Sequence, residues 1–291
     1  MNEYQGVNKK EMVVLIPISE IDDFPNHPFQ VKDNEEMEQL VHSIRMNGVL
    51  NPLIVRKKTD GRFEIVAGHR RKRACAILGL QILPAIEREM NRDEAIIEMV
   101  DSNIQRETIL PSEKARAYKM KLEAMKRQGL RTDLTFCPTG TKLNTAKDIA
   151  EQSNESERQI YRYVRLTELV PELLDYVDAG KLALRPAVEL SYLQEEEQRA
   201  LVETIESEDC FPSHAQTIRM KQLSREGKLD MDAIFNIMTE QKGNQKEKIK
   251  IPMEKLEKYF PRGTPPKRME DTIIKALEFY RKRQRESREA R

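Results

Sequence analysis

The pattern of hydrophobic and polar positions changes part-way along this 291-residue chain. Residues 1–129 mix short apolar runs, typical of strands, with segments in which apolar residues recur every three or four positions. From Thr145 to about Gly227 every segment has the helical period, and none alternates as a half-buried strand does. The pattern therefore predicts an α+β protein, with a small mixed-sheet domain followed by an all-helical domain.

Turn and stop signals divide the first half into short elements. Gly48 follows one helical stripe as a stop signal, and Thr59-Asp60-Gly61 is a good hairpin turn. Asp93 is expected to cap a helix with the apolar stripe Ile97, Val100 and Ile104, and Pro111 suits the first turn of the next. We expect strands over 12–18, 53–55, 63–66 and 82–86, and helices over 35–47, 68–79, from 93, and from 111 to about 128.

Polar stretches rich in turn residues mark the domain boundaries. We predict a disordered tail (1–10), a sheet-bearing domain (11–129), a linker (130–144), a helical domain (145–239), a second linker (240–248) and a C-terminal strand–helix unit (249–291). The last helix, from about Arg268, carries an apolar stripe that one short helix cannot bury alone. Pairing with a second copy is favoured over packing on the Ile249/Ile251 strand. The basic end, 281–291, fits a nonspecific DNA contact or a solvated tail.

Composition narrows the class of protein. The net charge is only +1, so any affinity for nucleic acid must come from local basic patches. Three isolated cysteines favour reduced thiols, and the four histidines have no ligand spacing with them, so no metal cluster is expected. No segment resembles a signal peptide or a membrane span. We expect a cytoplasmic, nucleoid-associated protein.

The run Gly68-His69-Arg70-Arg71-Lys72-Arg73 follows a predicted strand and opens a predicted helix. Free backbone N–H groups and the positive end of the helix dipole favour an anion at such a position. Four consecutive cations strengthen that field, and the glycine permits close approach of a phosphate. The alternative from these residues alone is a solvated basic helix start.

A helix-turn-helix is predicted around Ser153-Asn154-Glu155. Thr145 caps the first helix, with Ile149 and Ala150 inward, and Ser156 forms a capping-box pair with Gln159 at the start of the second. Asn154 tolerates the left-handed conformation of the turn. Arg and Gln side chains suit base edges and phosphates, although an ordinary helical hairpin with a basic face is the alternative. The candidate DNA-binding residues are Thr145, Lys147, Ser156, Arg158, Gln159, Tyr161, Arg162, Arg165 and Arg185.

Four stretches, in this order, resemble the ParB family of plasmid and chromosome partition proteins. They are Gly48–Val55, Gly68–Ala74, Asn103–Glu107, and the helix-turn-helix followed by Gly180-Lys181-Leu182. The resemblance spans roughly Leu15 to Leu193. It implies an N-terminal domain of the ParB/sulfiredoxin fold that binds CTP and Mg²⁺. It also implies a homodimer that CTP closes into a clamp on double-stranded DNA at a palindromic centromere-like site, with a ParA-type ATPase as a further partner.

The same resemblance implies roles for particular residues. Gly48, Asn51 and Pro52 would lie near the base and ribose, while Asn103 and Arg106 would contact Mg²⁺ and phosphate oxygens. The residues that would surround the triphosphate are Gly68, His69, Arg70, Arg71 and Arg73. Arginine forks pair well with phosphate oxygens, and an amide oxygen suits Mg²⁺.

Two departures from the family pattern bear on hydrolysis and on alternatives. The family usually has Glu where this chain has His69, and Glu where it has Ser102, which follows Asp101. Because Ser102 has no charge to position water or metal, we expect CTP binding with at most weak CTPase activity. A site-specific transcriptional regulator without nucleotide gating is the alternative function. A sulfiredoxin-type enzyme needs a cysteine where Gly68 stands, and Cys75 lies too far into the helix.

Overall fold

We describe the protein from a computed structural model. The structure describes residues 12–106, 109–134, 145–240, 259–260, 264–265, 268–269, 271–277 and 279. Two compact units, Met1–Glu240 and Gln241–Arg291, are each described by themselves. The predicted tail, the part of the first linker from 135, the second linker from 241 and the Lys248–Ile251 strand lie outside the described residues. No helix in the described part of the chain is long and apolar enough to cross a membrane.

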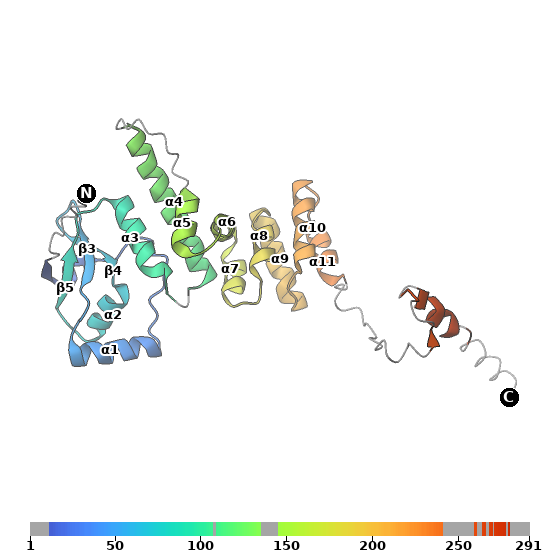
Figure 1. Cartoon of the computed structure of the whole chain (residues 1–291), viewed down its shortest axis with the longest axis horizontal. Coiled ribbons are helices and arrows are strands. Elements are labelled where there is room, and N and C mark those ends of the chain that lie inside the picture. The colour runs from blue at the N-terminus through green and yellow to red at the C-terminus, as the bar shows by residue number, and fades with distance from the viewer. Residues whose placement is uncertain are drawn as a thin grey trace, which may run out of the picture. The chain divides into compact units, whose positions relative to one another are not determined.

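A five-stranded mixed sheet forms the first part of the larger unit (Figure 1). Its strands are β1 (Val13–Pro17), β2 (Ile21–Asp22), β3 (Leu53–Lys57), β4 (Phe63–Ala67) and β5 (Ile82–Glu87). The order is β1-β5-β3-β4-β2, with β3/β5 and β2/β4 parallel and the other pairs antiparallel. The predicted hairpin is confirmed, since the N–H of Gly61 bonds to Lys58 O at 3.1 Å. The two-residue strand β2 is an addition to the prediction.

Helices cover both faces of this sheet because neighbouring strand residues point to opposite sides. Val55 and Ile65 pack in one core with α1 (Glu35–Asn47) and α2 (His69–Ile77), which contribute Met37 and Cys75. On the other face, Val66 packs with Met99 of α3 (Arg92–Ile104). The helix α1 has the bounds predicted for it, and Gly48 ends it with a φ of 71°.

The start of α3 differs from the prediction. Asn91, rather than Asp93, is the N-cap: its side chain accepts hydrogen bonds from the N–H groups of Asp93 and Glu94. Asp93 is instead buried in the first turn, where its carboxylate bonds to Arg127 Nε at 2.8 Å. The buried stripe is correspondingly shifted to Ala95, Ile96, Met99, Val100 and Asn103, with Ile97 and Ile104 only partly buried.

The longest helix, α4 (Pro111–Leu134), connects the sheet-bearing part to the helical part. Pro111 is its first residue, as predicted, but Gly129 does not end it. A single glycine costs a helix only about 1 kcal/mol, and good helix formers follow it. At its N-terminus the N–H of Ser112 donates to Asp178 Oδ1 (2.9 Å) and its hydroxyl donates to Asp178 Oδ2 (2.5 Å). The helix α4 contacts α3, α5, α6 and α7, so it belongs to both parts.

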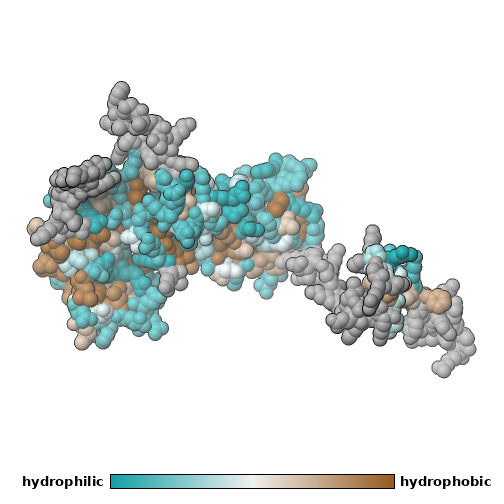
Figure 2. All heavy atoms as spheres, in the orientation of Figure 1, coloured by the Kyte–Doolittle hydropathy of each residue, from teal (hydrophilic) through white to brown (hydrophobic). Residues whose placement is uncertain are grey.

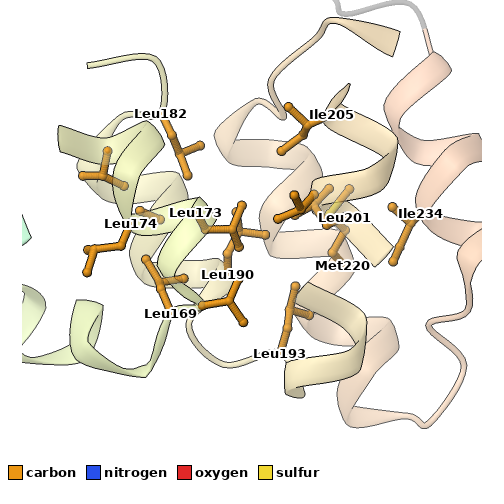
Figure 3. Packing of buried hydrophobic residues seen from close by; sticks show 14 of the residues in the cluster. Leu169, Leu173, Leu174, Leu182, Leu190, Leu193, Leu201, Ile205, Met220 and Ile234 are labelled. Atoms are coloured by element: carbon orange, nitrogen blue, oxygen red, sulfur yellow. The ribbon is translucent and has the colours of Figure 1, made fainter. Parts of the chain in front are cut away.

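Helices alone follow in the described residues up to 240, as the period predicts. They are α5 (Thr145–Ser153), α6 (Glu157–Arg165), α7 (Pro171–Asp178), α8 (Leu184–Leu190), α9 (Glu195–Glu208), α10 (His214–Arg225) and α11 (Met231–Thr239), with a 3₁₀ turn at Leu166–Glu168. Figure 3 shows their shared core, in which Leu173, Leu190, Leu201 and Met220 point toward one another. All four side chains are fully buried.

The second unit contains a helical segment in the described residues 268–269, 271–277 and 279, as predicted. The predicted apolar stripe is Met269, Ile273, Leu277 and Tyr280. Met269 is buried, Ile273 is partly buried and Leu277 is 61% exposed. Tyr280 lies outside the described residues. Pairing of this helix with a second copy stays a prediction.

Candidate functional site

Two adjoining cavities lie beside the N-terminus of α2. Their volumes are about 780 and 620 Å³, and Glu36, Arg70 and Arg106 line both. We call the two together the cleft. The first cavity is further lined by Gln30, Lys32, Asn34, Ile109, Leu110 and Glu113. The second is further lined by Gln39, Leu40, Ala67, Gly68, Arg71, Ser102 and Asn103.

Residues at the N-termini of three helices line this cleft. Asn34 caps α1, Arg70 lies in the first turn of α2, and Glu113 lies in the first turn of α4. A helix N-terminus carries the positive end of the helix dipole. That of α2 has no side-chain cap, whereas the N–H of Met37 in α1 donates to Asn34 and the N–H of Ser112 in α4 donates to Asp178. Glu113 uses its carboxylate internally, accepting hydrogen bonds from the N–H groups of Gln30 and Leu110. The arrangement favours a polyanion in the cleft.

Two guanidinium groups add positive charge to the cleft. Arg70 Nη1 pairs with Glu36 Oε2 at 3.0 Å, and Arg106 stacks over the ring of Phe29 at 5.8 Å. Burial, with the nearby charge of Arg70, lowers the pKa of Arg106. Because guanidinium stays protonated in proteins, this shift reports a cation that is poorly compensated by its surroundings. An anion between the two arginines would supply that compensation.

Gly68 allows the strand β4 to turn into α2 at the floor of the cleft. Its φ is 105°, in the left-handed region. A Cβ at this position would lie 2.7 Å from Leu53 Cδ2 and 3.0 Å from Arg71 Nη2. Arg71 Nη1 in turn donates to the carbonyls of Asn51 and Pro52, the latter at 2.6 Å. Arg71 therefore fixes the loop before β3, in addition to lining the cleft.

His69 follows Gly68, but its side chain turns away into the core. It is 7% exposed, does not line the cleft, and stacks on His27 with 3.7 Å between ring centroids. Burial lowers the pKa of His69 to about 2, helped by His27, Lys72 and Arg106. Burial likewise lowers the pKa of His27. The side chain of His69 therefore does not reach the cleft. Any influence of His69 on a nucleotide would act through the position of the start of α2.

Four other predicted nucleotide residues do not line the cleft. Arg73 does not line the cleft, and its guanidinium pairs with Asp33 at 2.6 Å. Gly48 ends α1, and Asn51 and Pro52 contribute backbone carbonyls to Arg71. The residues of the prediction that the structure does bring together are Gly68, Arg70, Arg71, Asn103 and Arg106.

The segment Asp101-Ser102-Asn103 borders the cleft from α3. Asn103 is buried, and its Nδ2 donates to Met99 O at 2.7 Å, which leaves Oδ1 as the atom available to a cation. An amide oxygen is a ligand that Mg²⁺ accepts, so this residue fits the implied ion. Ser102 lines the cleft, whereas Asp101 pairs with Lys121 in α4. Among the described residues no group of three or more His, Cys, Asp or Glu side chains is placed to hold a metal.

The polar segment before α1 was not among the predicted site residues. Gln30, Lys32 and Asn34 all line the cleft, as does Glu113. One signal was present: Asn34 followed by two glutamates is a helix start, and its side chain accepts from the N–H of Met37 at 3.2 Å. Nothing in the sequence indicates that this helix start lies beside that of α2.

A second candidate site is the outer face of α6. The turn before α6 is confirmed: Asn154 has a φ of 54°, and Ser156 caps α6 by accepting from the N–H of Gln159 at 3.2 Å. Ile149, Ala150 and Ile160 are buried between α4, α5 and α6, as predicted. Gln159 is not seen to complete the capping box, since its Oε1 accepts from Arg162 Nη1 at 3.4 Å.

The helical period places four α6 residues on one stripe. At 100° per residue, Arg158, Tyr161, Arg162 and Arg165 fall within one 100° arc. Arg158 and Tyr161 are exposed, and Arg162 and Arg165 are partly buried. Elsewhere, Arg185 is exposed on α8, Lys147 is exposed beside Glu151, and Thr145 begins α5 with its side chain outside the described residues. Figure 2 shows hydrophilic residues over the helical part of the molecule and hydrophobic ones gathered on the sheet-bearing part.

Comparison with known proteins finds one family model. The ParB N-terminal domain model matches residues 2–104. This part of the chain is therefore similar to the N-terminal domain of ParB proteins. The matched residues include the sheet and α1 to α3, together with Gly68, Arg70, Arg71 and Asn103 of the cleft, and stop just before Arg106.

Relatives extend the similarity beyond the ParB N-terminal domain. The chromosome-partitioning protein Spo0J of Thermus thermophilus is 32% identical over 186 residues, which is 64% of this chain and 62% of the relative. A nucleoid occlusion protein of a Geobacillus species is 41% identical over 117 residues, 40% of this chain and 41% of the relative. The chain thus spans less than two thirds of the length of these relatives.

Solved structures of the chromosome-partitioning protein ParB of Caulobacter crescentus, C-terminally truncated, are also similar. The complex with the centromeric parS site has 25% identity and a TM-score of 0.43, covering 73% of this chain and 99% of that one. The complex with CTP-gamma-S has 28% identity and a TM-score of 0.31, covering 67% and 98%.

Proposed function

We propose that this chain is a ParB-family DNA-partition protein that binds CTP and Mg²⁺ in the cleft and duplex DNA through α6. CTP binding closes two protomers into a clamp around DNA, which loads at a palindromic site and slides from it. The observation that carries the proposal is the convergence of three helix N-termini with Arg70 and Arg106 at a cleft that includes residues of the ParB N-terminal domain match, 2–104.

The cleft supports the nucleotide part of the proposal. A triphosphate needs N–H donors and cations in one place, and the uncapped first turn of α2 with the two arginines supplies both. A volume of several hundred Å³ is typical of pockets that hold small molecules. Asn103 would hold Mg²⁺ together with the phosphates, and the choice of cytosine as the base follows from the family resemblance.

The basic stripe of α6 supports the DNA part. Arg158, Arg162 and Arg165 share one face of a capped helix that follows a tight turn, which is the geometry by which recognition helices enter a major groove. The names of the relatives, chromosome partitioning and nucleoid occlusion, are in keeping with a protein that acts on DNA. The homodimer is assigned to the C-terminal helix, and a ParA-type ATPase is the expected partner of the partition reaction.

Isothermal titration of the full chain with CTP at millimolar Mg²⁺ tests the nucleotide site. Arg70→Ala and Arg106→Ala should each weaken binding by at least about tenfold, because each removes a charge-assisted contact worth about 1.5–3 kcal/mol. Arg73→Ala is the matched control: it removes an equal charge from the same helix but pairs with Asp33 outside the cleft. Equal losses in all three variants, or no uptake by the folded wild type, would reject the site.

Mapping the protein along its own replicon tests the partition function against its alternative. The clamp predicts a narrow peak at one palindrome with broad shoulders, and Arg106→Ala should remove the shoulders while keeping the peak. A narrow peak without shoulders in both proteins would instead identify a site-specific transcriptional regulator that reads DNA without nucleotide gating.

A further inference from the structure

Tyr192 lies between two cations beyond the end of α6. The guanidinium carbon of Arg165 is 4.1 Å from the centroid of its ring, and Lys221 Nζ is 3.6 Å from the same centroid. These residues come from three elements: Arg165 is the last residue of α6, Tyr192 follows α8, and Lys221 belongs to α10. The ring is 42% exposed, so the assembly lies at the surface.

Hydrogen bonds also hold Arg165 in place. Its Nε donates to Ser191 Oγ at 3.1 Å, and its Nη2 donates to Ser191 O at 2.6 Å. Ser191 is itself 2% exposed and donates to Val188 O at 2.8 Å. A guanidinium has five N–H donors, so these two bonds leave three donors for another molecule. The side chain is therefore fixed before any ligand arrives.

The positive charge of Arg165 has no carboxylate partner among the residues that the structure describes. Lys221 does have one, since its Nζ pairs with Glu189 at 2.7 Å. Two glutamates, Glu168 and Glu195, line the same surface pocket as Arg165, but they pair with Lys119 and Arg199, respectively. The assembly around Tyr192 thus presents one uncompensated, immobilised cation.

The other two arginines of the stripe are held far less firmly. Arg162 makes one long hydrogen bond, 3.4 Å to Gln159 Oε1. Arg158 is exposed and has no hydrogen bond or ion pair within the described part of the chain. Long, unrestrained arginines can extend to base edges in a groove. A guanidinium tied to Ser191 and stacked on Tyr192 cannot extend, and it suits the regular row of backbone phosphates.

We propose that Arg165 is a preset phosphate contact for duplex DNA and that Tyr192 is the residue that positions it. The inference rests on the proposed DNA binding by α6 and assigns different DNA contacts to the arginines of that helix. Arg158 and Arg162 read the bases, whereas Arg165 contacts the backbone whatever the sequence. Presetting the guanidinium reduces the entropy that binding must remove from a long side chain.

Fluorescence anisotropy with a labelled random-sequence duplex tests the phosphate contact in the full chain. Arg165→Ala should reduce the slope of log affinity against log salt by about 0.9, the value for one lost phosphate contact. It should also weaken binding to the random duplex and to the mapped palindrome by the same factor. Arg219→Ala, which removes an exposed arginine paired with Glu240, should leave the slope unchanged. An unchanged slope in Arg165→Ala overturns the proposal.

A double-mutant cycle tests the role of Tyr192. Tyr192→Leu removes the stack while keeping an apolar side chain and should weaken binding to both duplexes by about threefold or more, a loss of the size of one exposed cation–π pair. Tyr192→Phe, which keeps the ring face, should restore wild-type binding. In the Arg165→Ala background Tyr192→Leu should have no further effect. A full additional loss in that background assigns Tyr192 to the fold alone and overturns its positioning role.

These experiments distinguish a failure of this inference from a failure of the proposed DNA binding by α6. A wild-type chain that binds neither duplex rejects DNA binding by α6 and the inference with it. A wild-type chain that binds both duplexes, while Arg165→Ala changes base discrimination and not the salt slope, keeps the function and rejects the preset phosphate contact.

Discussion

The ammonium group of Lys121 in α4 lies against the carboxylate of Asp101 in α3. Its Nζ donates to Asp101 Oδ1 and, at 2.5 Å, to Gln152 Oε1 in α5. The lysine side chain is 2% exposed, whereas that of Asp101 is 39% exposed. One buried cation of α4 therefore joins α3, the helix that carries Asn103, to α5.

Removing either partner of this ion pair should lower the free energy of unfolding, but removing Asp101 should lower it more than removing Lys121. Asp101→Asn leaves the buried Lys121 charge without its anion and should lower the free energy of unfolding by about 3 kcal/mol. Lys121→Met fills the space with an apolar chain and leaves Asp101 free to hydrate, so we expect a loss of only about 1 kcal/mol. Urea unfolding of both variants measures the difference. A larger loss in Lys121→Met than in Asp101→Asn would contradict the asymmetry.

Gly68→Ala should destabilise the protein and weaken nucleotide binding together. The new methyl group overlaps Leu53 and presses on Arg71, at a φ that L-residues avoid. We expect a loss of about 2–4 kcal/mol in unfolding free energy, from backbone strain and overpacking. Gly61→Ala is the control, because its φ is 85° with nothing within 4 Å of the added Cβ. It should cost about 1 kcal/mol and leave CTP titrations unchanged.

The His27–His69 pair should make stability depend on pH. Both histidines have lowered pKa values, that of His69 to about 2, so the folded state binds fewer protons than the unfolded state below about pH 6.5. Stability should therefore fall as pH drops from about 6.5 toward 4.5, by up to about 1.4 kcal/mol per pH unit for each proton.

The pH dependence can be measured by urea unfolding at several pH values. Lys72 and Arg106 lie near His69 and oppose its protonation, while Asp23 and Glu113 near His27 favour protonation there. His69→Gln should flatten the dependence by about one proton, since an amide does not titrate. A His69→Gln profile parallel to the wild type would show that the pair does not titrate on unfolding.

CTP turnover should stay near the uncatalysed rate. Ser102 is the α3 side chain beside Asn103 that lines the cleft, and it has no charge with which to orient water. The adjacent carboxylate, Asp101, is held by Lys121 instead. A phosphate-release assay with saturating CTP, Mg²⁺ and DNA should therefore give little above background. Ser102→Glu, which places a carboxylate at the cleft, should raise the rate, and brisk release by the wild type would refute the expectation.

Local sequence signals predicted most elements of the fold. Gly48 and Gly61 mark their turns, Asn154 marks the left-handed residue between α5 and α6, and Pro111 begins α4. The sequence was less reliable where two neighbouring residues could both serve as the N-cap of a helix. Asn91 and Asp93 are both good capping residues, and Asn91 wins because Glu94 reciprocates with a hydrogen bond to its N–H at 2.7 Å.

The candidate site was harder to predict, because a sequence motif does not give side-chain direction. Gly68, Arg70 and Arg71 face the cleft, but His69 does not, since successive helical residues point about 100° apart. Arg73 follows Arg70 by one turn, yet it pairs with Asp33 and does not line the cleft. Gln30, Lys32 and Glu113 reach the cleft only through the tertiary packing of α1 and α4. The stack of Arg165 on Tyr192 likewise joins residues that are far apart in sequence.

Because Asp178 of α7 caps the N-terminus of α4, the part of the chain that carries the cleft cannot be excised cleanly at the linker that the sequence suggests. A fragment ending before α5 would strip α4 of that cap and uncover Tyr118 and Leu122, which now face α5 and α6. Truncated variants of this protein should therefore retain residues through at least 178. A shorter fragment would report the destabilisation of α4 and not the properties of the cleft.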